Sequence, residues 1–573
     1  MLSIENVPDT TFNLLISTAL KFPEKIALTG RYKGEEVSYT YSKLVELAKA
    51  CACGLLGLGL QKGDHIGIIT NNRAEWYILD LASSQLGIIN VTLFPNYDAP
   101  ALKHILNDAD ISYLFVANNL LHKMAKPALQ GVDGLKGVVS FDEAPDCISF
   151  NTLLNNPANE QYTAEVEKIS STIKPDDVYC IFYTSGTGGN PKGVTTMHKG
   201  ICSAAVSMGA ALGLTENDKA ICFLSISHAY ERGHNFAYMH HGVEIYIGDM
   251  TNGPMENIAN AQPSFFASVP LMLERIFGGI TANDTQDEAG KRALEIAINY
   301  EFGDEDKPEF IEAKANYFDN WKSKFGANMR ILSCAGAPLP AWLARFYWAI
   351  GLPIYEVYGL SECFSVTYGR GREYTKFGTV GAVAEWAEVK IAEDGEILFR
   401  GPFTMKGFHN LPEYTKQVLE EDGWFHTGDL GEMVDGKFVR ITGRKKDIFK
   451  VSSGYYVHPP LVEDKVNASP YIARSIAFDR GARVGLIVQP EYGLLANELG
   501  IDAATLATPQ HTGLVLNKIQ AEVDKYYNTY VMEAERIAEY FIDPKPWTVE
   551  GGELTPTMKI KREIVIKNLE TIR

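Results

Sequence analysis

The stretch VYCIFYTSGTGGNPKGVTTMH, residues 178–198, sets the expectation for the fold because it joins two apolar runs through a loop rich in Gly, Ser and Thr. Residues 178–183 are typical of a buried strand, and residues 194–197 are typical of a second one. Amide and hydroxyl groups in the loop suit an anion, and Lys192 adds a positive charge. The stretch therefore predicts a strand-loop-strand that holds phosphate.

This loop does not have the pattern of a P-loop NTPase. That pattern requires Gly, four residues, Gly-Lys and then Ser or Thr, with a helix following at once. Here Gly186 is followed by four residues and then by Pro191-Lys192-Gly193, so no hydroxyl follows the lysine. Pro191 also favours an extended conformation at Asn190 rather than entry into a helix. We expect phosphate to be held by a different design.

The length and charge of the chain exclude several classes of protein. A chain of 573 residues is long enough for two or more domains. The formal charge of −18, with no basic stripe, argues against nucleic acid as a partner. No apolar run approaches the roughly 18 residues of a membrane span, and Glu5 and Asp9 stand where a signal peptide is basic. We therefore expect a cytoplasmic enzyme with at most peripheral membrane contact, and a homodimer is left open.

The eight cysteines and the histidines do not form a metal-binding pattern. Cys51 and Cys53 are too close together for a zinc ribbon, and no second pair follows at a suitable spacing. Four histidines lie between residues 228 and 241, but no cysteine or carboxylate pattern completes a site. We expect no structural zinc.

Helices and apolar strands alternate through most of the first 445 residues, which predicts parallel pairing in an α/β domain. The expected order is a helix capped by Thr40 over 41–58, a strand in DHIGIIT (64–70), a helix over 74–86, a strand in INVTLF (89–94), a helix over 99–108 and a strand in SYLFV (112–116).

Three changes in this pattern indicate the domain organisation. Residues 281–326 are charged and poor in strand pattern, so we predict a helical insertion there. EVKIAEDGEILFRGP (388–402) alternates around Asp394-Gly395, which predicts a hairpin in a small β subdomain. From Lys446 the pattern changes to short strands and helices, so we predict an N-terminal domain over 1–445 and a C-terminal domain over 446–573.

Further loops share the excess of Gly, hydroxyl and charged residues. They are CAGAPLP (334–340), YEVYGLSEC (355–363), DGWFHTGDLG (422–431), ITGRKKDIFKVSSGYYVHP (441–459) and GGELTPTMKIKR (551–562). Taken singly, each has an ordinary structural explanation: Asp429 could be a turn residue and Lys559 a solvated lysine. Their occurrence together, in this order, favours one common site.

The order of these motifs resembles the adenylate-forming (ANL) superfamily of acyl-CoA synthetases, adenylation domains and luciferases. Within it the chain looks like a long-chain fatty-acid–CoA ligase. DGWFHTGDLG with GKFVRITGRKKDIFK is similar to the fatty-acyl-CoA synthetase signature, SISHAYERG (225–233) to the long-chain His-x-x-Glu-Arg motif, and WTVEGGELTPTMKIKR (547–562) to the ending of the long-chain family. The resemblance covers almost the whole chain. It implies a large multi-layer α/β N-terminal domain with a small β subdomain, plus a small mobile α+β C-terminal domain.

The activity that the resemblance implies is the ATP-dependent conversion of a fatty acid, of the long-chain class, to acyl-AMP with release of pyrophosphate. Thioester formation with coenzyme A follows. ATP, Mg²⁺ and coenzyme A are the implied cofactors and co-substrates. Little proton transfer is needed in the first step, so catalysis rests on positioning and on neutralising phosphate charge. That requirement accounts for the repeated Ser, Thr, Gly and Lys.

The resemblance also implies a role for each matching residue of the N-terminal domain. The β- and γ-phosphates would be held by Thr184, Ser185, Gly186, Thr187, Gly188 and Lys192. Mg²⁺ would be bound by Glu362 with Thr184, and Ser361 would lie near the α-phosphate. The adenine would be bordered by Gly336, Ala337 and Pro338, with Tyr358 stacked on it and Gly359 in the same loop. His228, with the aromatic residues around it, would flank the acyl site.

In the C-terminal part, Asp429 would accept hydrogen bonds from both ribose hydroxyls, assisted by Arg444. Lys446 would be the hinge about which the small domain rotates. Lys559 would reach the acyl carboxylate and the α-phosphate. Lys561 and Arg562, which follow it, are expected to be ordinary surface charges.

Two departures from the family pattern leave alternatives open. Gly188 stands where the family usually has a threonine, so one hydroxyl is lost from the phosphate loop. His458-Pro459-Pro460 replaces a common Ala-Pro-Glu near the path of the thiol, so an acyl carrier protein in trans is an alternative acceptor. Further alternatives are a ligase for medium-chain or aromatic acids, a luciferase-like oxygenase and a non-catalytic acyl sensor.

Overall fold

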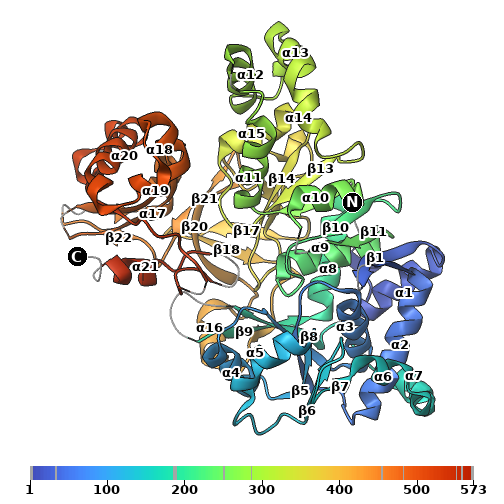
Figure 1. Ribbon diagram of the computed structural model, residues 1–573. Coiled ribbons are helices and arrows are strands. Elements are labelled where there is room, and N and C mark those ends of the chain that lie inside the picture. The colour runs from blue at the N-terminus through green and yellow to red at the C-terminus, as the bar shows by residue number, and fades with distance from the viewer. Residues whose placement is uncertain are drawn as a thin grey trace. The chain divides into compact units, whose positions relative to one another are not determined.

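The computed structural model describes residues 4–32, 35–184, 190–249, 252–285, 287–452, 456–481, 483–549, 551–555 and 559–569. They divide into two compact units, coloured mainly blue to yellow and red in Figure 1. The larger unit comprises residues 1–390, 398–426 and 434–439, and the smaller one 391–397, 427–433 and 440–573. By this division Lys446 lies within the smaller unit, and its role as a hinge stays a prediction.

One sheet of the larger unit carries the stretch that opened the sequence analysis. Its strands, in spatial order, are β19 (Gly407–Phe408), β9 (Lys192–Met197), β8 (Val178–Thr184), β4 (Ile89–Leu93), β3 (His65–Ile69), β5 (Ile111–Val116), β6 (Gly137–Ser140) and β7 (Ile148–Ser149). All neighbours from β8 to β7 pair in parallel, whereas β8 with β9 and β9 with β19 are antiparallel. The predicted parallel α/β arrangement is confirmed, and so are the two strands predicted on either side of the phosphate loop.

The second sheet of the larger unit has a parallel centre. From one edge its strands run in the order β2 (Glu35–Thr40), β1 (Ile26–Tyr32), β11 (Glu244–Ile247), β10 (Lys219–Cys222), β12 (Phe265–Ser268), β13 (Ile331–Cys334), β14 (Ile354–Tyr358), β15 (Thr367–Tyr368) and β16 (Ala382–Val383). Neighbours from β1 to β14 pair in parallel, whereas β2 with β1, β14 with β15 and β15 with β16 are antiparallel. β17 (Glu388–Ile391), β18 (Glu396–Arg400), β20 (Phe425–Val434) and β21 (Phe438–Arg444) each have residues in both units. β17 and β18 flank Asp394-Gly395, as the hairpin signal predicted.

The helices of the larger unit are α1 (Thr11–Lys21), α2 (Tyr41–Gly57), α3 (Ala74–Leu86), α4 (Ala99–Asp108), α5 (Asn119–Leu129), α6 (Phe150–Asn155), α7 (Thr163–Ser170), α8 (His198–Ala211), α9 (Ala229–His240), α10 (Pro254–Ala261), α11 (Pro270–Thr281), α12 (Glu288–Ile298), α13 (Pro308–Ala313), α14 (Asp319–Ser323), α15 (Ala341–Ala349) and α16 (Pro412–Val418). Of these, α2, α3 and α4 had predicted bounds, and they begin and end close to them. The Thr40 side chain caps α2 by accepting a hydrogen bond from the Lys43 amide. The described part of 281–326 contains helices and turns but no strand, as predicted. None of the described helices is both long and apolar enough to cross a membrane.

The smaller unit has its own core around a mixed sheet. β24 (Ile472–Asp479) pairs antiparallel with β25 (Val484–Pro490), which pairs parallel with β26 (Ile537–Ile542). The other elements are β22 (Phe449–Lys450), β23 (Tyr456–Val457), α17 (Pro459–Val466), α18 (Tyr492–Leu499), α19 (Ala503–Leu506), α20 (Thr512–Tyr526) and α21 (Arg562–Leu569). Val484 and Leu486 on β25 and Val515 on α20 are fully buried in this core.

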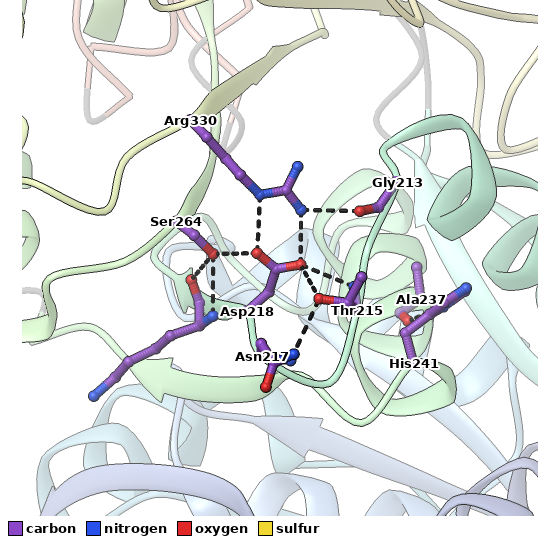
Figure 2. A network of polar contacts seen from close by, with 9 residues as sticks. Gly213, Thr215, Asn217, Asp218, Ala237, His241, Ser264 and Arg330 are labelled. Carbon is purple, nitrogen blue, oxygen red and sulfur yellow. Dashed lines mark hydrogen bonds and ion pairs between the residues drawn. The ribbon is translucent and has the colours of Figure 1, made fainter.

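A carboxylate at the amino ends of three neighbouring strands fixes their alignment (Figure 2). Asp218, Ser264 and Arg330 immediately precede β10, β12 and β13. Arg330 binds Asp218 through Nε at 2.9 Å and Nη2 at 2.7 Å, and the Ser264 hydroxyl donates to Asp218 at 2.7 Å. Burial raises the pKa of Asp218, but these hydrogen bonds outweigh it and hold the pKa below its ordinary value. The loops at the opposite, carboxyl ends of these strands therefore start from a fixed register.

A buried ion pair joins two helices to the first sheet. Arg232 on α9 is bonded to Asp80 on α3, and their side chains are 0% and 1% exposed. Asp80 also accepts hydrogen bonds from the Tyr179 hydroxyl on β8 and from the side-chain Nδ2 of Asn90 on β4, the latter at 2.7 Å. The guanidinium lies 4.6 Å from the Trp76 ring, so its face is also covered. One carboxylate thus holds three other elements in place.

We predict that Asp80→Ala destabilises the larger unit strongly. The change leaves the Arg232 charge buried without its partner, which costs about 3–5 kcal/mol. The midpoint of urea unfolding, followed by circular dichroism, should fall clearly. Asp176→Ala is the control, because Asp176 pairs with Lys199 at 2.5 Å but its side chain is 72% exposed. Equal midpoints for the two variants would contradict the importance of the buried pair.

Candidate active site

The predicted site residues are divided between the two units. In the larger unit they are Thr184, Lys192, His228, Gly336, Ala337, Pro338, Tyr358, Gly359, Ser361 and Glu362; in the smaller unit they are Asp429, Arg444, Lys446 and Lys559. The remaining predicted residues, Ser185, Gly186, Thr187 and Gly188, lie outside the described residues.

The two ends of the phosphate loop are held together by strand pairing. Thr184, the last residue of β8, is the partner of Lys192, the first residue of β9. The Thr184 hydroxyl donates to the Lys192 carbonyl at 3.5 Å, and the Lys192 ammonium lies 4.5 Å from the centre of the Tyr414 ring. Because a strand and not a helix follows the loop, the exclusion of the P-loop NTPase fold is confirmed. Tyr414, on α16, was not predicted, since nothing in its local sequence links it to a lysine more than two hundred residues away.

Several predicted residues converge at the carboxyl end of the second sheet. β10, β12, β13 and β14 are parallel neighbours, so the residues that follow them lie along one edge, where α/β sheets bind their ligands. His228 follows β10, Gly336 follows β13, and Gly359 follows β14. Gly336 has φ of +91°, which favours glycine, and it turns the chain so that Ala337 and Pro338 are exposed.

The loop after β14 is closed by backbone contacts. A Cβ on Gly359 would lie 1.8 Å from the Phe364 carbonyl oxygen, so only glycine fits at this position. The Val366 amide donates to the Tyr358 carbonyl at 2.8 Å, and the Met405 amide donates to the Glu362 carbonyl at 2.7 Å. These contacts constrain a short loop whose half-buried members include Ser361 and Glu362. Tyr358 itself is 7% exposed, so most of its ring packs against protein.

The residues of the motif His228-x-x-Glu-Arg lie in two different environments, the carboxyl edge of the second sheet and the buried core. His228 caps α9 by accepting a hydrogen bond from the Tyr230 amide at 3.2 Å. The Tyr230 hydroxyl is 2.7 Å from the Ser333 hydroxyl on β13. Glu231 and Arg232 are wholly buried, and burial raises the pKa of Glu231 to about 8. The last two residues of the motif are therefore structural, and only its start lies at the sheet edge.

In the smaller unit, Asp429 and Arg444 are in direct contact. Arg444 donates through Nε to Asp429 at 2.8 Å, and the Asp429 side chain is only 6% exposed. The Asp429 amide donates to the Thr427 hydroxyl at 3.1 Å, which fixes the backbone beside it. A nearly buried carboxylate with a guanidinium partner is more than an ordinary turn residue.

A second carboxylate supports the Asp429 loop, and sequence reasoning missed it. Glu396, which is 4% exposed, accepts hydrogen bonds from the Gly428 amide at 2.9 Å and from Lys445 at 3.0 Å. Lys445 also binds Asp394 at 2.6 Å. The sequence indicates this role only weakly, because Glu396 is one of several acidic residues in a hairpin whose apolar and polar residues alternate. Its partner Lys445 lies in the charged loop 441–459, where nothing in the sequence marks it as the partner of Glu396.

The two predicted lysines of the smaller unit are exposed, but Arg562, further along the tail, is not a surface charge. Lys446 and Lys559 both present exposed side chains. Arg562, expected to be an ordinary surface charge, instead binds the buried Glu463 with both terminal nitrogens. The expectation of a surface charge is therefore wrong. It could not be corrected from the sequence, which does not show that α17 brings a carboxylate to the start of α21.

The described residues contain no group of three or more His, Cys, Asp and Glu side chains arranged to hold a metal ion. A magnesium ion does not need such a group, because it commonly takes one or two carboxylates and completes its shell with water and substrate phosphates. The donor types of Glu362 and Thr184 fit that requirement.

Comparison with known proteins identifies relatives along nearly the whole chain. A sequence profile described as AMP-binding enzyme matches residues 16–409. The chain is 30% identical over 566 residues to long-chain-fatty-acid–CoA ligase FadD15 of Mycobacterium bovis, with 95% of this chain and 93% of the relative covered. It is 28% identical over 572 residues to the peroxisomal long chain acyl-CoA synthetase 7 of Arabidopsis thaliana, with 92% and 80% covered.

Solved structures share the fold. The anthranilate CoA ligase AuaEII in complex with anthranoyl-AMP has a TM-score of 0.73 and 19% identity, with 99% of both chains covered. The fatty acyl CoA synthetase of Mycobacterium tuberculosis has a TM-score of 0.65 and 21% identity, with 98% of this chain and 99% of that chain covered. The predicted fold, with a large α/β part and a smaller C-terminal part, is confirmed by these likenesses.

Proposed function

Because the chain belongs to the AMP-binding enzyme family, we propose that the protein is a long-chain fatty-acid–CoA ligase. It uses ATP to convert a fatty acid to acyl-AMP and then transfers the acyl group to coenzyme A. The observation that carries the substrate class is the 30% identity, over 95% of the chain, to a relative named for this activity. The solved structures are too distant in sequence to support more than the fold.

In the first step a carboxylate oxygen of the fatty acid attacks the α-phosphorus of ATP, and pyrophosphate leaves. Thr184 and Lys192, with Ser185, Gly186, Thr187 and Gly188, would hold the β- and γ-phosphates. Strand pairing of Thr184 with Lys192 fixes the two ends of that loop, and the hydroxyl, amide and ammonium groups of its residues would bind the phosphates. Mg²⁺, held by Glu362 with Thr184, would supply positive charge at the phosphates.

The family resemblance assigns recognition of the nucleoside to two groups of residues. Gly336, Ala337 and Pro338 would border the adenine with Tyr358 and Gly359, while Ser361 would lie near the α-phosphate. Asp429 would accept both ribose hydroxyls, and Arg444, already bonded to it at 2.8 Å, would orient the carboxylate. His228, at the edge of the second sheet, would flank the acyl carboxylate.

In the second step the thiolate sulfur of coenzyme A attacks the acyl carbon of acyl-AMP, and AMP leaves. Lys559 would serve only the first step, because rotation about Lys446 would remove it before the thiol enters. An acyl carrier protein in trans, or a medium-chain or aromatic acid, is the alternative to be separated by experiment. A cytoplasmic location, peripheral membrane contact and a homodimer stay predictions.

The proposed function is tested by a panel of fatty acids of increasing chain length, with benzoate and anthranilate as aromatic members. AMP release should be greatest with long-chain acids and should require coenzyme A for turnover. Equal turnover with a phosphopantetheinylated carrier protein, or preference for an aromatic acid, would overturn the proposal. Oxygen uptake with any acyl-AMP would indicate an oxygenase instead.

Asp429→Ala should weaken the use of ATP without unfolding the protein. A charge-assisted hydrogen bond contributes roughly 1.5–3 kcal/mol, so the KM for ATP should rise about tenfold or more. Steady-state kinetics with ATP as the varied substrate measure this. An unchanged KM for ATP would make Asp429 a structural residue of the loop.

Lys559→Ala should separate the two half-reactions. Loss of one preorganised donor at the α-phosphate should lower acyl-AMP formation by about 10²-fold, whereas transfer from supplied acyl-AMP to coenzyme A should fall far less. Lys561→Ala is the control, since Lys561 is not expected to reach the substrate. If both variants lose the two half-reactions equally, Lys559 has no special role.

A further inference from the structure

Arg562, near the C-terminus, has no role in the proposed reaction, yet its side chain is held in place by an ion pair. It begins α21, only three residues after Lys559. Its side chain is 22% exposed, and that of its partner Glu463, on α17, is 10% exposed. Both belong to the smaller unit, which contains α17 and α21 (Figure 1). An arginine in this position is not a solvated charge.

The contact between these residues is a two-pronged ion pair. Arg562 donates through Nη1 to one oxygen of Glu463 at 2.6 Å and through Nη2 to the other oxygen. The first oxygen also accepts the Ala477 amide at 2.7 Å, so α17, α21 and β24 meet at one carboxylate. A planar guanidinium matches both carboxylate oxygens in a way that a lysine ammonium cannot.

Arg562 also reaches the segment of the predicted hinge. Its Nε lies 3.8 Å from the carboxylate of Asp447, the residue after Lys446. The Asp447 amide in turn donates to the Arg444 carbonyl at 3.0 Å. One guanidinium therefore connects the start of α21 with the turn that carries Arg444 and Lys446.

The segment that carries Lys559 is tied to α21 by its backbone. The Thr555 amide donates to the Lys559 carbonyl at 2.8 Å, and the Lys559 amide donates to the Thr555 hydroxyl at 3.0 Å. The Lys561 amide donates to the Glu553 carbonyl at 2.8 Å. Val565 of α21 is buried in a core with Leu554. A displacement of Arg562 would consequently be passed to Lys559 through a short, bonded segment.

We propose that Arg562 is a positioning residue for adenylation. By binding Glu463 and reaching Asp447, it makes the Lys559 segment and the turn at Lys446 move as one body, so that Lys559 arrives at the α-phosphate in a defined place. This role rests on the proposed function, in which Lys559 serves the first half-reaction. An ordinary structural ion pair would affect the stability of the unit and both half-reactions alike.

The first test is Arg562→Lys, which keeps the charge but removes the two-pronged contact. Acyl-AMP formation should fall about 10- to 100-fold, the scale of a small misplacement of a catalytic group, with the KM values for ATP and fatty acid little changed. Transfer from supplied acyl-AMP to coenzyme A should stay near that of the unaltered protein. Arg480→Lys is the matched control, because Arg480 pairs with Glu539 at 2.9 Å in the same unit and its side chain is 29% exposed.

The second test combines Arg562→Lys with Lys559→Ala. If Arg562 acts through Lys559, the double variant should form acyl-AMP no more slowly than Lys559→Ala alone, because the effects of two residues that act as a unit are not additive. Additive losses would overturn the positioning role. If Arg562→Lys does not fold, Asp447→Asn replaces it, since that change weakens the contact with the turn and leaves Glu463 paired; it should show the same selective loss.

The outcomes distinguish this inference from the function on which it rests. Selective loss of adenylation in Lys559→Ala, with equal loss of both half-reactions in Arg562→Lys, would overturn the positioning role and leave the proposed function intact. Equal loss of both half-reactions in Lys559→Ala would overturn the role of Lys559 and the inference with it. An effect of Arg480→Lys as selective as that of Arg562→Lys would also overturn the inference.

Discussion

The buried ion pair of Asp80 and Arg232 is the constraint on which the larger unit depends. Removing two charges from water is costly, and the contact offsets that cost only when the other donors and acceptors around it are satisfied. The carboxylate meets this condition, since Asp80 accepts from Arg232, Tyr179 and Asn90 at once. Nε and Nη1 of Arg232 do not, because they are buried without a hydrogen-bond partner among the described residues and the guanidinium lies against the Trp76, Tyr179 and Phe182 rings. The position of α9 relative to β8 and β4 is thereby set by one carboxylate. Because β8 ends at Thr184 and α9 begins beside His228, the same contact positions two parts of the candidate site.

In the second sheet, the contact that aligns the strands lies at the end opposite to the candidate site. Asp218 fixes the amino ends of β10, β12 and β13, while the candidate loops follow the carboxyl ends. The loops themselves are then constrained by local backbone contacts, most clearly at Gly359, where a side chain would meet the Phe364 carbonyl. Such preorganisation suits a reaction in which positioning and electrostatics contribute more than proton transfer.

The smaller unit uses charged groups in a different way. Glu396 and Glu463 are both nearly buried, and each binds a cation from a distant segment, Lys445 and Arg562 respectively. Neither Glu396 nor Glu463 is among the residues proposed to contact the substrate. They hold the segments that bear Asp429 and Lys559, and those segments carry the proposed chemistry of this unit. In the proposed function, a moving domain would place Lys559 reproducibly only if the segment bearing it is itself rigid.

The sequence by itself determined the class of fold, the two strands that flank the loop in 178–197 and the bounds of α2, α3 and α4, because apolar periodicity and capping residues act over short distances. The family motifs also assigned Asp429 and Arg444 to the same ribose as an expectation, and the structure shows that the two side chains are in direct contact. Only the tertiary structure decided that Arg232 belongs to the core and that Arg562 is not a surface charge. In each case the deciding partner, Asp80 or Glu463, lies about a hundred residues or more away along the chain. Local pattern carries no information about such a partner, because the pair exists only after the chain has folded.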